Sequence, residues 1–271
     1  MKMNNSNLKA IIQKVTVLPI RHAFYLLGTM TACVLMMPSI TSAEVIKLEV
    51  LTMEMPPYVM PGAESGSVID TLKEVAKRSG MELKFSITPL KRGSNEVKQT
   101  PNTCVAPLDR SQERETEYKW VSPVLITQSA FFSKKKDSIK IDTLTDAKKH
   151  KVGVLRGGVV EEMLTGKKFE LENANDDFQN LKKLQAGRFE LWAADTLIAP
   201  YWAKQEKVDI EELYTFATTL AAMACNKGIS DQKIEKMNTE LTKMYKDGKM
   251  KQIFQKYTSQ LGIHVKASFL N

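Results

Sequence analysis

The sequence predicts an α/β protein made of two units, each with a mostly parallel sheet flanked by helices. Short runs rich in β-branched residues alternate with stretches of helical periodicity, at a spacing typical of strand–helix–strand units. The alternation starts near residue 45 and starts again after residue 132. The last helices follow a strand that fits neither unit in simple order.

The first 43 residues predict an export signal. Residues 1–21 carry basic but no acidic side chains, residues 23–37 are apolar, and the stretch ends in Ser42-Ala43. This order is typical of a secretory signal peptide. The apolar run is shorter than the ~20 residues of a membrane-spanning helix. We expect cleavage after Ala43; an uncleaved anchor is the alternative, because the basic region is long.

The remaining 228 residues form a chain long enough for one or two domains. They hold 35 basic and 31 acidic side chains, a net charge of +4, and no basic stripe interleaved with aromatics. We therefore do not expect a nucleic-acid partner. Cys104 and Cys225 either pair in an oxidising compartment or are two small buried residues, and the sequence does not decide between them.

The first unit begins with an alternating strand at 45–51, followed by a loop at 52–58 that contains consecutive prolines. Ser67 is the expected N-cap of a helix that Gly80 ends. We expect further elements in this order: strand 82–87, helix 89–98 and strand 103–108.

The second unit repeats the pattern. Gly157 and Gly158 open one helix, and Asp176 or Asp177 caps the next. Asp195 follows a predicted strand. The expected elements are helix 144–150, strand 151–155, helix 159–164, a helix from 178 to 186, strand 189–193, helix 196–204, extended passes over 214–226, and helices 230–247 and 250–257.

A charged segment at 110–123 separates two strand-like runs, so it should be a helix or turn at the mouth of a sheet. Arg110 and Arg114 are four residues apart and would share one helical face. An arginine there can bind a ligand carboxylate through two parallel hydrogen bonds. Alternatively, the arginines pair with the segment's own glutamates on a solvated surface.

Leu108 to Glu115, followed by Tyr118-Lys-Trp-Val-Ser-Pro123, resembles the signature of the bacterial extracellular solute-binding proteins of family 3. These are periplasmic, amino-acid-type receptors of ABC importers. The resemblance implies a two-lobed periplasmic-binding-protein fold of type II with a ligand cleft between the lobes. It places lobe 1 at 44–129 and 220–271 and lobe 2 at 130–219, with hinges near 126–130 and 218–220.

The resemblance also implies a set of binding residues. Arg114, six residues before the aromatic Trp120, would bind the ligand carboxylate, and Asp195 would pair with the ligand ammonium; a plain N-cap is the other interpretation of Asp195. Gly158 and Val159 open a helix whose N–H groups could face an anion, although Gly158 replaces the family's usual threonine. The remaining candidates are Tyr58, Leu90 and Trp120 as pocket walls and Glu54, Arg92 and Arg110 as rim groups.

Ala106 and Pro107 depart from the family, which usually has small hydroxyl residues there to help hold an ammonium. The histidines are scattered, and we find no zinc spacing, nucleophile elbow or other catalytic motif. We therefore expect a monomeric periplasmic binding protein without metal or cofactor, not an enzyme. Its ligand would be an amino acid or small organic acid, and its partner an inner-membrane ABC permease.

Two alternatives stay open. An exported enzyme on the same scaffold, similar to dehydratases of prephenate-like acids, would need a general acid or base such as Glu54, Asp109 or Asp195. A sensory partner would present its ligand state to a membrane receptor.

Overall fold

The computed structural model describes residues 46–260. The predicted signal peptide and its cleavage site lie outside the described residues. Within the described part of the chain, no helix combines the length and apolar character needed to cross a membrane.

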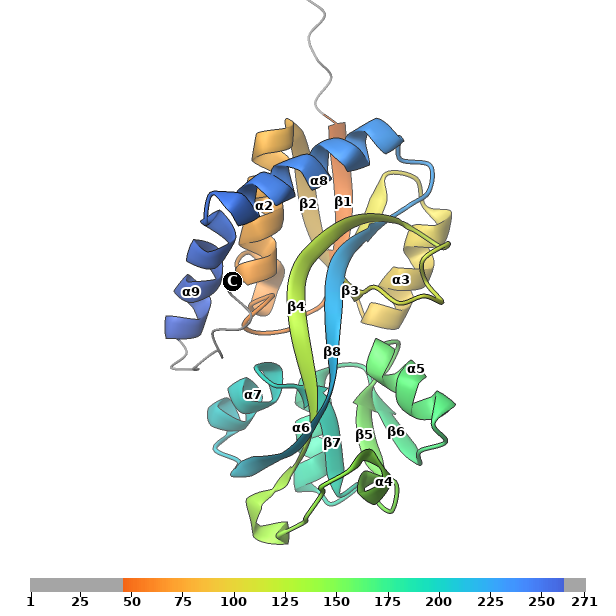
Figure 1. The fold of residues 1–271 in the computed structure, drawn as a ribbon, viewed down its shortest axis with the longest axis vertical. Coiled ribbons are helices and arrows are strands. Elements are labelled where there is room, and N and C mark those ends of the chain that lie inside the picture. Colours follow the sequence, from red (N-terminus) through yellow and green to blue (C-terminus); the bar gives the residue numbers. More distant parts are fainter. Residues whose placement is uncertain (1–45, 261–271) are drawn as a thin grey trace, which may run out of the picture. The chain divides into compact units, whose positions relative to one another are not determined.

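The described residues form one eight-stranded mixed sheet with helices on both faces (Figure 1). The strand order is β2-β1-β3-β8-β4-β7-β5-β6. The strands are β1 (Ile46–Thr52), β2 (Met81–Ile87), β3 (Thr103–Asp109), β4 (Lys119–Lys134), β5 (Val152–Leu155), β6 (Leu171–Ala174), β7 (Leu191–Asp195) and β8 (Ile210–Cys225). The helices are η3 (Pro61–Ala63), α2 (Ser67–Ser79), α3 (Leu90–Gln99), η4 (Lys135–Asp137), α4 (Leu144–Ala147), α5 (Val159–Gly166), α6 (Asp177–Gln185), α7 (Ile198–Glu206), α8 (Asp231–Lys246) and α9 (Lys249–Gln260).

The long strands β4 and β8 join two lobes and belong to both. They pair antiparallel along their lengths, from Lys119 opposite Cys225 to Lys134 opposite Ile210. On one side, β1 pairs parallel with β2 and β3; on the other, β5 pairs parallel with β6 and β7. We call β1–β3 with α2, α3, α8 and α9 lobe 1, and β5–β7 with α4–α7 lobe 2. The predicted architecture, two lobes that each contain a mostly parallel sheet flanked by helices, is confirmed. The crossing strands in addition join the two sheets into one continuous ladder.

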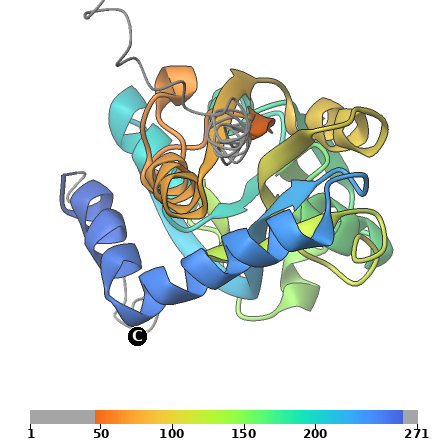
Figure 2. The ribbon, with the colours of Figure 1, turned by 90° about the horizontal axis from the view of Figure 1, so that it is seen from above.

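Helices cover both faces of the sheet in lobe 1. Figure 2 shows α2, α8 and α9 on one side and α3 on the other. The larger core contains Leu72, Val75 and Met237, which pack with inward-facing residues of β1 and β8. The smaller core, under α3, contains Leu90 and Trp120. The periodicity of α2 and α8 therefore predicted the buried helix faces correctly.

In lobe 2, successive side chains of a strand point to opposite faces of the sheet, and each face has its own hydrophobic core. Phe131 points to the face under α4 and α5, whereas Phe132 and Trp192 point to the face under α6 and α7. Because successive strand residues face opposite sides, a strand covered on both faces is apolar throughout. This is why residues 130–132 and 191–194 read as uninterrupted apolar runs.

Cys104 and Cys225 form a disulfide that joins β3 to β8. The two residues lie directly opposite each other in the antiparallel ladder, with Cα atoms 4.0 Å apart, and both are fully buried. The sequence left open whether these two cysteines pair, and in the structure they do.

Three local expectations differ from the structure. Gly66, not Ser67, is the N-cap residue of α2, and Ser67 is buried as the first helical residue. The 110–118 segment consists of turns, one of the two expected forms, so Arg110 and Arg114 do not share the helical face that their spacing allowed. Strand β6 was missed, because polar Glu172 and Asn173 interrupt the apolar pattern that marks a buried strand.

Candidate functional site

The carboxyl ends of the parallel strands from both lobes meet at a small cavity of about 70 Å³. Open α/β sheets bind ligands at this edge. The walls are mostly aliphatic, and they carry three carboxylates and four hydroxyls. The charged and polar side chains that line the cavity are Tyr58, Asp109, Thr127, Ser129, Asp177, Asp195 and Thr219.

Asp195 is the last residue of β7, and it connects the two lobes. Its Oδ1 accepts hydrogen bonds from the backbone N–H of Leu197 (2.7 Å) and of Ile198 (3.1 Å), at the start of α7. The hydroxyl of Tyr58, from the loop after β1, donates to both carboxylate oxygens at 3.0 and 3.1 Å. Burial raises the pKa of Asp195 to about 6, although these hydrogen bonds oppose the shift. Asp195 therefore accepts hydrogen bonds from the start of α7 and also lines the cavity.

Asp109 ends β3, on the lobe 1 side of the cavity. The Thr219 hydroxyl donates to its Oδ1 at 2.9 Å, and Thr219 also contacts Thr127 at 2.6 Å between the crossing strands. The backbone N–H of Val159 in lobe 2 lies against the same carboxylate. Burial raises the pKa of Asp109, and the Thr219 hydrogen bond opposes that rise.

Asp177 is the third carboxylate, and its role in the cavity was not predicted. Its neighbour Asp176 is the N-cap of α6 and accepts the Gln179 N–H at 2.7 Å. Asp177 is instead turned inward and is only 4% exposed. Burial, followed by the charges of Asp195 and Asp176, raises its pKa to about 7. Among the described residues that line the cavity there is no lysine, arginine or histidine.

Arg114 lies beside this cavity, at the edge of a wider pocket of about 550 Å³. It is 6% exposed, and its guanidinium reaches across to lobe 2. Nη2 donates to the carbonyl oxygen of Gly157 at 2.9 Å and to Oε1 of Glu162 at 2.6 Å, while Nη1 donates to the carbonyl oxygen of Asp109 at 3.2 Å. An internal carboxylate therefore occupies the arginine that the sequence assigned to a ligand carboxylate.

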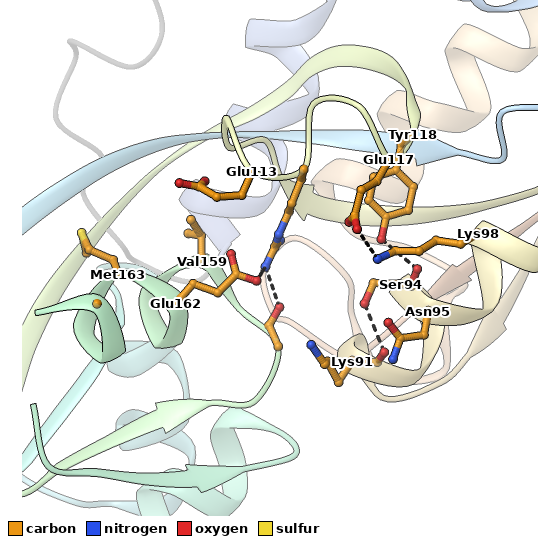
Figure 3. A pocket seen from close by; sticks show the side chains of 13 residues that line it. Lys91, Ser94, Asn95, Lys98, Glu113, Glu117, Tyr118, Val159, Glu162 and Met163 are labelled. Carbon is orange, nitrogen blue, oxygen red and sulfur yellow. Dashed lines mark hydrogen bonds and ion pairs between the residues drawn. The ribbon is translucent and has the colours of Figure 1, made fainter. Parts of the chain in front are cut away.

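Figure 3 shows the two sides of this wider pocket. Glu162 and Met163 come from α5, and Lys91, Ser94 and Lys98 come from α3. Lys98 pairs with Glu117 of the turn segment at 2.7 Å. The wider pocket is therefore lined by both basic and acidic groups, whereas the charged groups that line the smaller cavity are all acidic.

The turn from β5 into α5 lies close to lobe 1. Gly157 has a φ of +80°, and a Cβ there would lie 2.8 Å from the Cβ and 2.9 Å from the Cα of Lys91. Only glycine fits both the conformation and the contact. Gly158 is the N-cap residue of α5, and both it and Val159 line the cavity. Acidic groups of the chain already face this helix start, namely Asp109 and Glu161.

The structure brings together five of the predicted site residues: Tyr58, Leu90, Gly158, Val159 and Asp195 all line the cavity. Arg114 lies beside it, as described above, and Trp120, Arg110 and Glu54 are not among its lining residues. Trp120 packs against Tyr118 in the core under α3. Arg110 pairs with Glu115 and stacks over the Trp120 ring at 5.6 Å, and Glu54 accepts the Gly62 N–H at 3.0 Å.

The polar lining that the sequence analysis missed comes from Asp177 and from the crossing strands. Ala106 and Pro107 stand where hydroxyl residues were expected, and the cavity obtains its hydroxyls from Thr127, Ser129 and Thr219 instead. These three residues lie on β4 and β8 where the two strands cross between the lobes, and this position is the feature that could have identified them. The described residues contain no group of three or more His, Cys, Asp or Glu side chains that could hold a metal ion.

Comparisons with known proteins place this architecture in a family. The "Putative ABC transporter arginine-binding protein 2" of Escherichia coli (strain K12) is 26% identical over 163 residues, which span 56% of this chain and 64% of that protein, less than two thirds of its length. A histidine kinase sensor domain with similarity to periplasmic binding proteins superposes with a TM-score of 0.73 at 18% identity, covering 79% of this chain and 96% of its own. An ancestral arginine-binding protein bound to arginine gives a TM-score of 0.67 at 24% identity, with coverage of 78% and 97%. Residues 48–260 match the bacterial extracellular solute-binding proteins, family 3, and the chain belongs to that family.

Proposed function

We propose that this protein captures a small amino-acid-like solute between its two lobes and delivers it to an ABC importer. The lobes would comprise 44–129 with 220–271, and 130–219, and they would move about hinges at 126–130 and 218–220. Membership of the family implies a periplasmic or extracellular location. We propose the periplasm, reached through a signal peptide that is cleaved after Ala43.

One observation carries the ligand assignment: the buried guanidinium of Arg114 holds a carboxylate, that of Glu162. Arginine binds carboxylates through charge-assisted hydrogen bonds of fixed geometry. Glu162 is 43% exposed and could move away from this position. A ligand carboxylate would then take its place on Arg114, while the ligand ammonium would lie in the acidic cavity beside Asp195.

Contacts between the two lobes across the cleft characterise the closed form. Tyr58 and Asp195 meet across the cleft, as do Arg114 and Gly157. A ligand that binds the closed form better than the open form selects closure, and the closed form would be recognised by the importer. Two strands cross between the lobes, and their pairing at Thr127 and Thr219 supports the hinge assignment.

A thermal-shift panel of amino acids, organic acids, polyamines and sugars tests this function. A ligand present at ~100 times its dissociation constant adds about 2.7 kcal/mol to the free energy of unfolding, which is a measurable shift. Arg114→Ala should abolish binding, and Arg114→Lys should weaken it strongly, because lysine lacks the planar two-pronged donor. Arg110→Ala is the matched control, since Arg110 pairs with Glu115 outside the cavity. Unchanged affinity in Arg114→Ala would reject the carboxylate assignment.

An enzyme on this scaffold is a second candidate function. Asp195 and Asp177 have pKa values of about 6 and about 7, near those of effective general acids and bases. Incubating the protein with prephenate-like acids and following product formation separates the two functions. Turnover that Asp195→Asn abolishes would favour the enzyme. Ligand-dependent uptake that is lost when the gene is deleted would favour transport, and a bound ligand without any uptake would favour a sensory role.

A further inference from the structure

The small cavity contains three carboxyl groups, which is more than one ligand ammonium can pair with. Asp109, Asp177 and Asp195 line it, and the described lining residues include no basic side chain. The three carboxylates interact electrostatically, since Asp109 acts on Asp195 and Asp195 acts on Asp177. On the basis of the function proposed above, we propose that the solute carries a second cationic group, which Asp177 and Asp109 hold inside the cavity.

The three carboxylates differ in how well the protein satisfies them. Asp195 accepts from two backbone N–H groups and from Tyr58, so three of its roughly four acceptor sites are used. Asp109 accepts from Thr219, faces one backbone N–H and is stabilised by the nearby charge of Arg114, which the charge of Glu162 opposes. Asp177 is near the side chains of Trp192 and Asn180, yet burial and like charges outweigh these contacts. The carboxylate with the least compensation from the protein is therefore Asp177, and a ligand cation would be most stabilising there.

The volume and lining of the cavity fit a short aliphatic chain with a cationic end. A cavity needs about 10–15 Å³ to hold one water molecule, so about 70 Å³ admits a group of a few heavy atoms. Leu90, Leu125, Val159 and Ile198 supply aliphatic walls for methylene groups. Thr127 and Ser129 add hydroxyl oxygens that can accept from an ammonium or guanidinium. We therefore assign the solute to the diamino acids and their guanidino analogues.

The carboxylates could instead be neutral when the ligand binds, which would suit a neutral solute. The raised pKa values mean that Asp195 and Asp177 take up protons near neutral pH when no cation lies beside them. A cationic ligand would expel these protons, whereas a neutral ligand would not. The two cases therefore differ in how affinity depends on pH.

Isothermal titration of the exported protein with matched ligand pairs tests the proposal. L-Lysine and L-ornithine are compared with L-norleucine and L-norvaline, which keep the α-groups and the chain but lack the terminal ammonium. We expect the dibasic member of at least one pair to bind at least tenfold more tightly. Its advantage should grow as the pH rises from 5.5 to 8, because the carboxylates then become charged.

Variants of the carboxylates locate the second subsite. At pH 8, Asp177→Asn and Asp109→Asn should each lower the affinity for the dibasic ligand at least tenfold more than the affinity for its neutral partner. Asp176→Asn, which makes the same charge change at a cap position outside the cavity lining, should leave both affinities unchanged. A cooperative melting transition in each variant shows that it is folded.

The outcomes separate this inference from the proposed function. Equal affinity for dibasic and neutral partners, or no loss of dibasic affinity in Asp177→Asn, would overturn the second-cation inference and leave an amino-acid receptor. Cadaverine binding as tightly as lysine would support the cationic subsite but remove the carboxylate role of Arg114. If no amino acid or diamine binds, the proposed function fails and this inference fails with it.

Discussion

Replacing Asp177 with asparagine should stabilise the unliganded protein at pH 8. A carboxylate that is buried without a counter-charge destabilises the fold, and its raised pKa measures that cost. Because a tenfold change in proton affinity equals about 1.4 kcal/mol, a pKa of about 7 against the ordinary 3.8 corresponds to about 4 kcal/mol. Asparagine keeps the shape of the side chain and removes its charge. We expect the free energy of unfolding to rise by about 2 to 4 kcal/mol.

The sign of the pH dependence follows from the same shift. Between pH 3.8 and about 7 the folded protein holds a proton on Asp177 that the unfolded chain has lost. The contribution of this group to stability is therefore most favourable below about pH 4 and declines as the pH rises through 7. The gain in Asp177→Asn should accordingly be full at pH 8, partial at pH 6 and nearly absent at pH 4.

Urea unfolding, followed by circular dichroism at pH 4, 6 and 8 with the disulfide intact, measures this gain. Asp176→Asn is the matched control, because asparagine is as good an N-cap as aspartate and the residue lies outside the cavity. It should change stability by less than about 1 kcal/mol at every pH. A neutral or destabilising Asp177→Asn at pH 8 would show that Asp177 has a compensating partner, and the charge argument for a second cation would lose its main support.

Two further predictions concern packing and the disulfide. Gly153→Ala should lower the free energy of unfolding in urea by about 1–3 kcal/mol or more, because the added Cβ would lie 2.0 Å from the buried Phe189 ring. Gly166→Ala is the control: nothing lies within 4 Å of its added Cβ, so this variant should be neutral or slightly stabilising. A Cys104→Ala/Cys225→Ala double variant should lose about 4–5 kcal/mol, since the bond closes a loop of about 121 residues in the unfolded chain. Equal stability of the two glycine variants, or of the double variant and the parent protein, would contradict these estimates.

Periodicity predicted most of the fold because burial dictates it locally. The helical spacing of Ile234, Met237, Leu241 and Met244 predicted the buried face of α8. The continuity of the sheet could not be predicted in this way. Pairing between β4 and β8 depends on two segments about 90 residues apart, and their own residues do not identify the partner.

The candidate site was predictable where a residue's position along a strand or helix fixes its surroundings. Asp195, Gly158 and Val159 lie at element ends, and the ends of parallel strands meet at one edge. The occupation of Arg114 by Glu162 was not predictable, because these residues are 48 positions apart and meet only across the lobes. Burial of Asp177 was hidden for a related reason: either member of the Asp176–Asp177 pair could cap α6, and tertiary packing decides which one turns inward.

The arrangement of charge around the cleft gives ligand selection a physical basis. In the described structure the internal carboxylate of Glu162 holds Arg114, which also acts electrostatically on Asp109. The described lining of the acidic cavity beside it includes no basic side chain of its own. A solute with one carboxylate and one ammonium would replace Glu162 and balance one aspartate, so part of the charge would stay unbalanced. A solute with two cationic groups would balance more of it on closure. Because the energetic cost of unbalanced charge increases as water leaves the closing cleft, we expect selectivity for the second cation to appear mainly in the closed, liganded state.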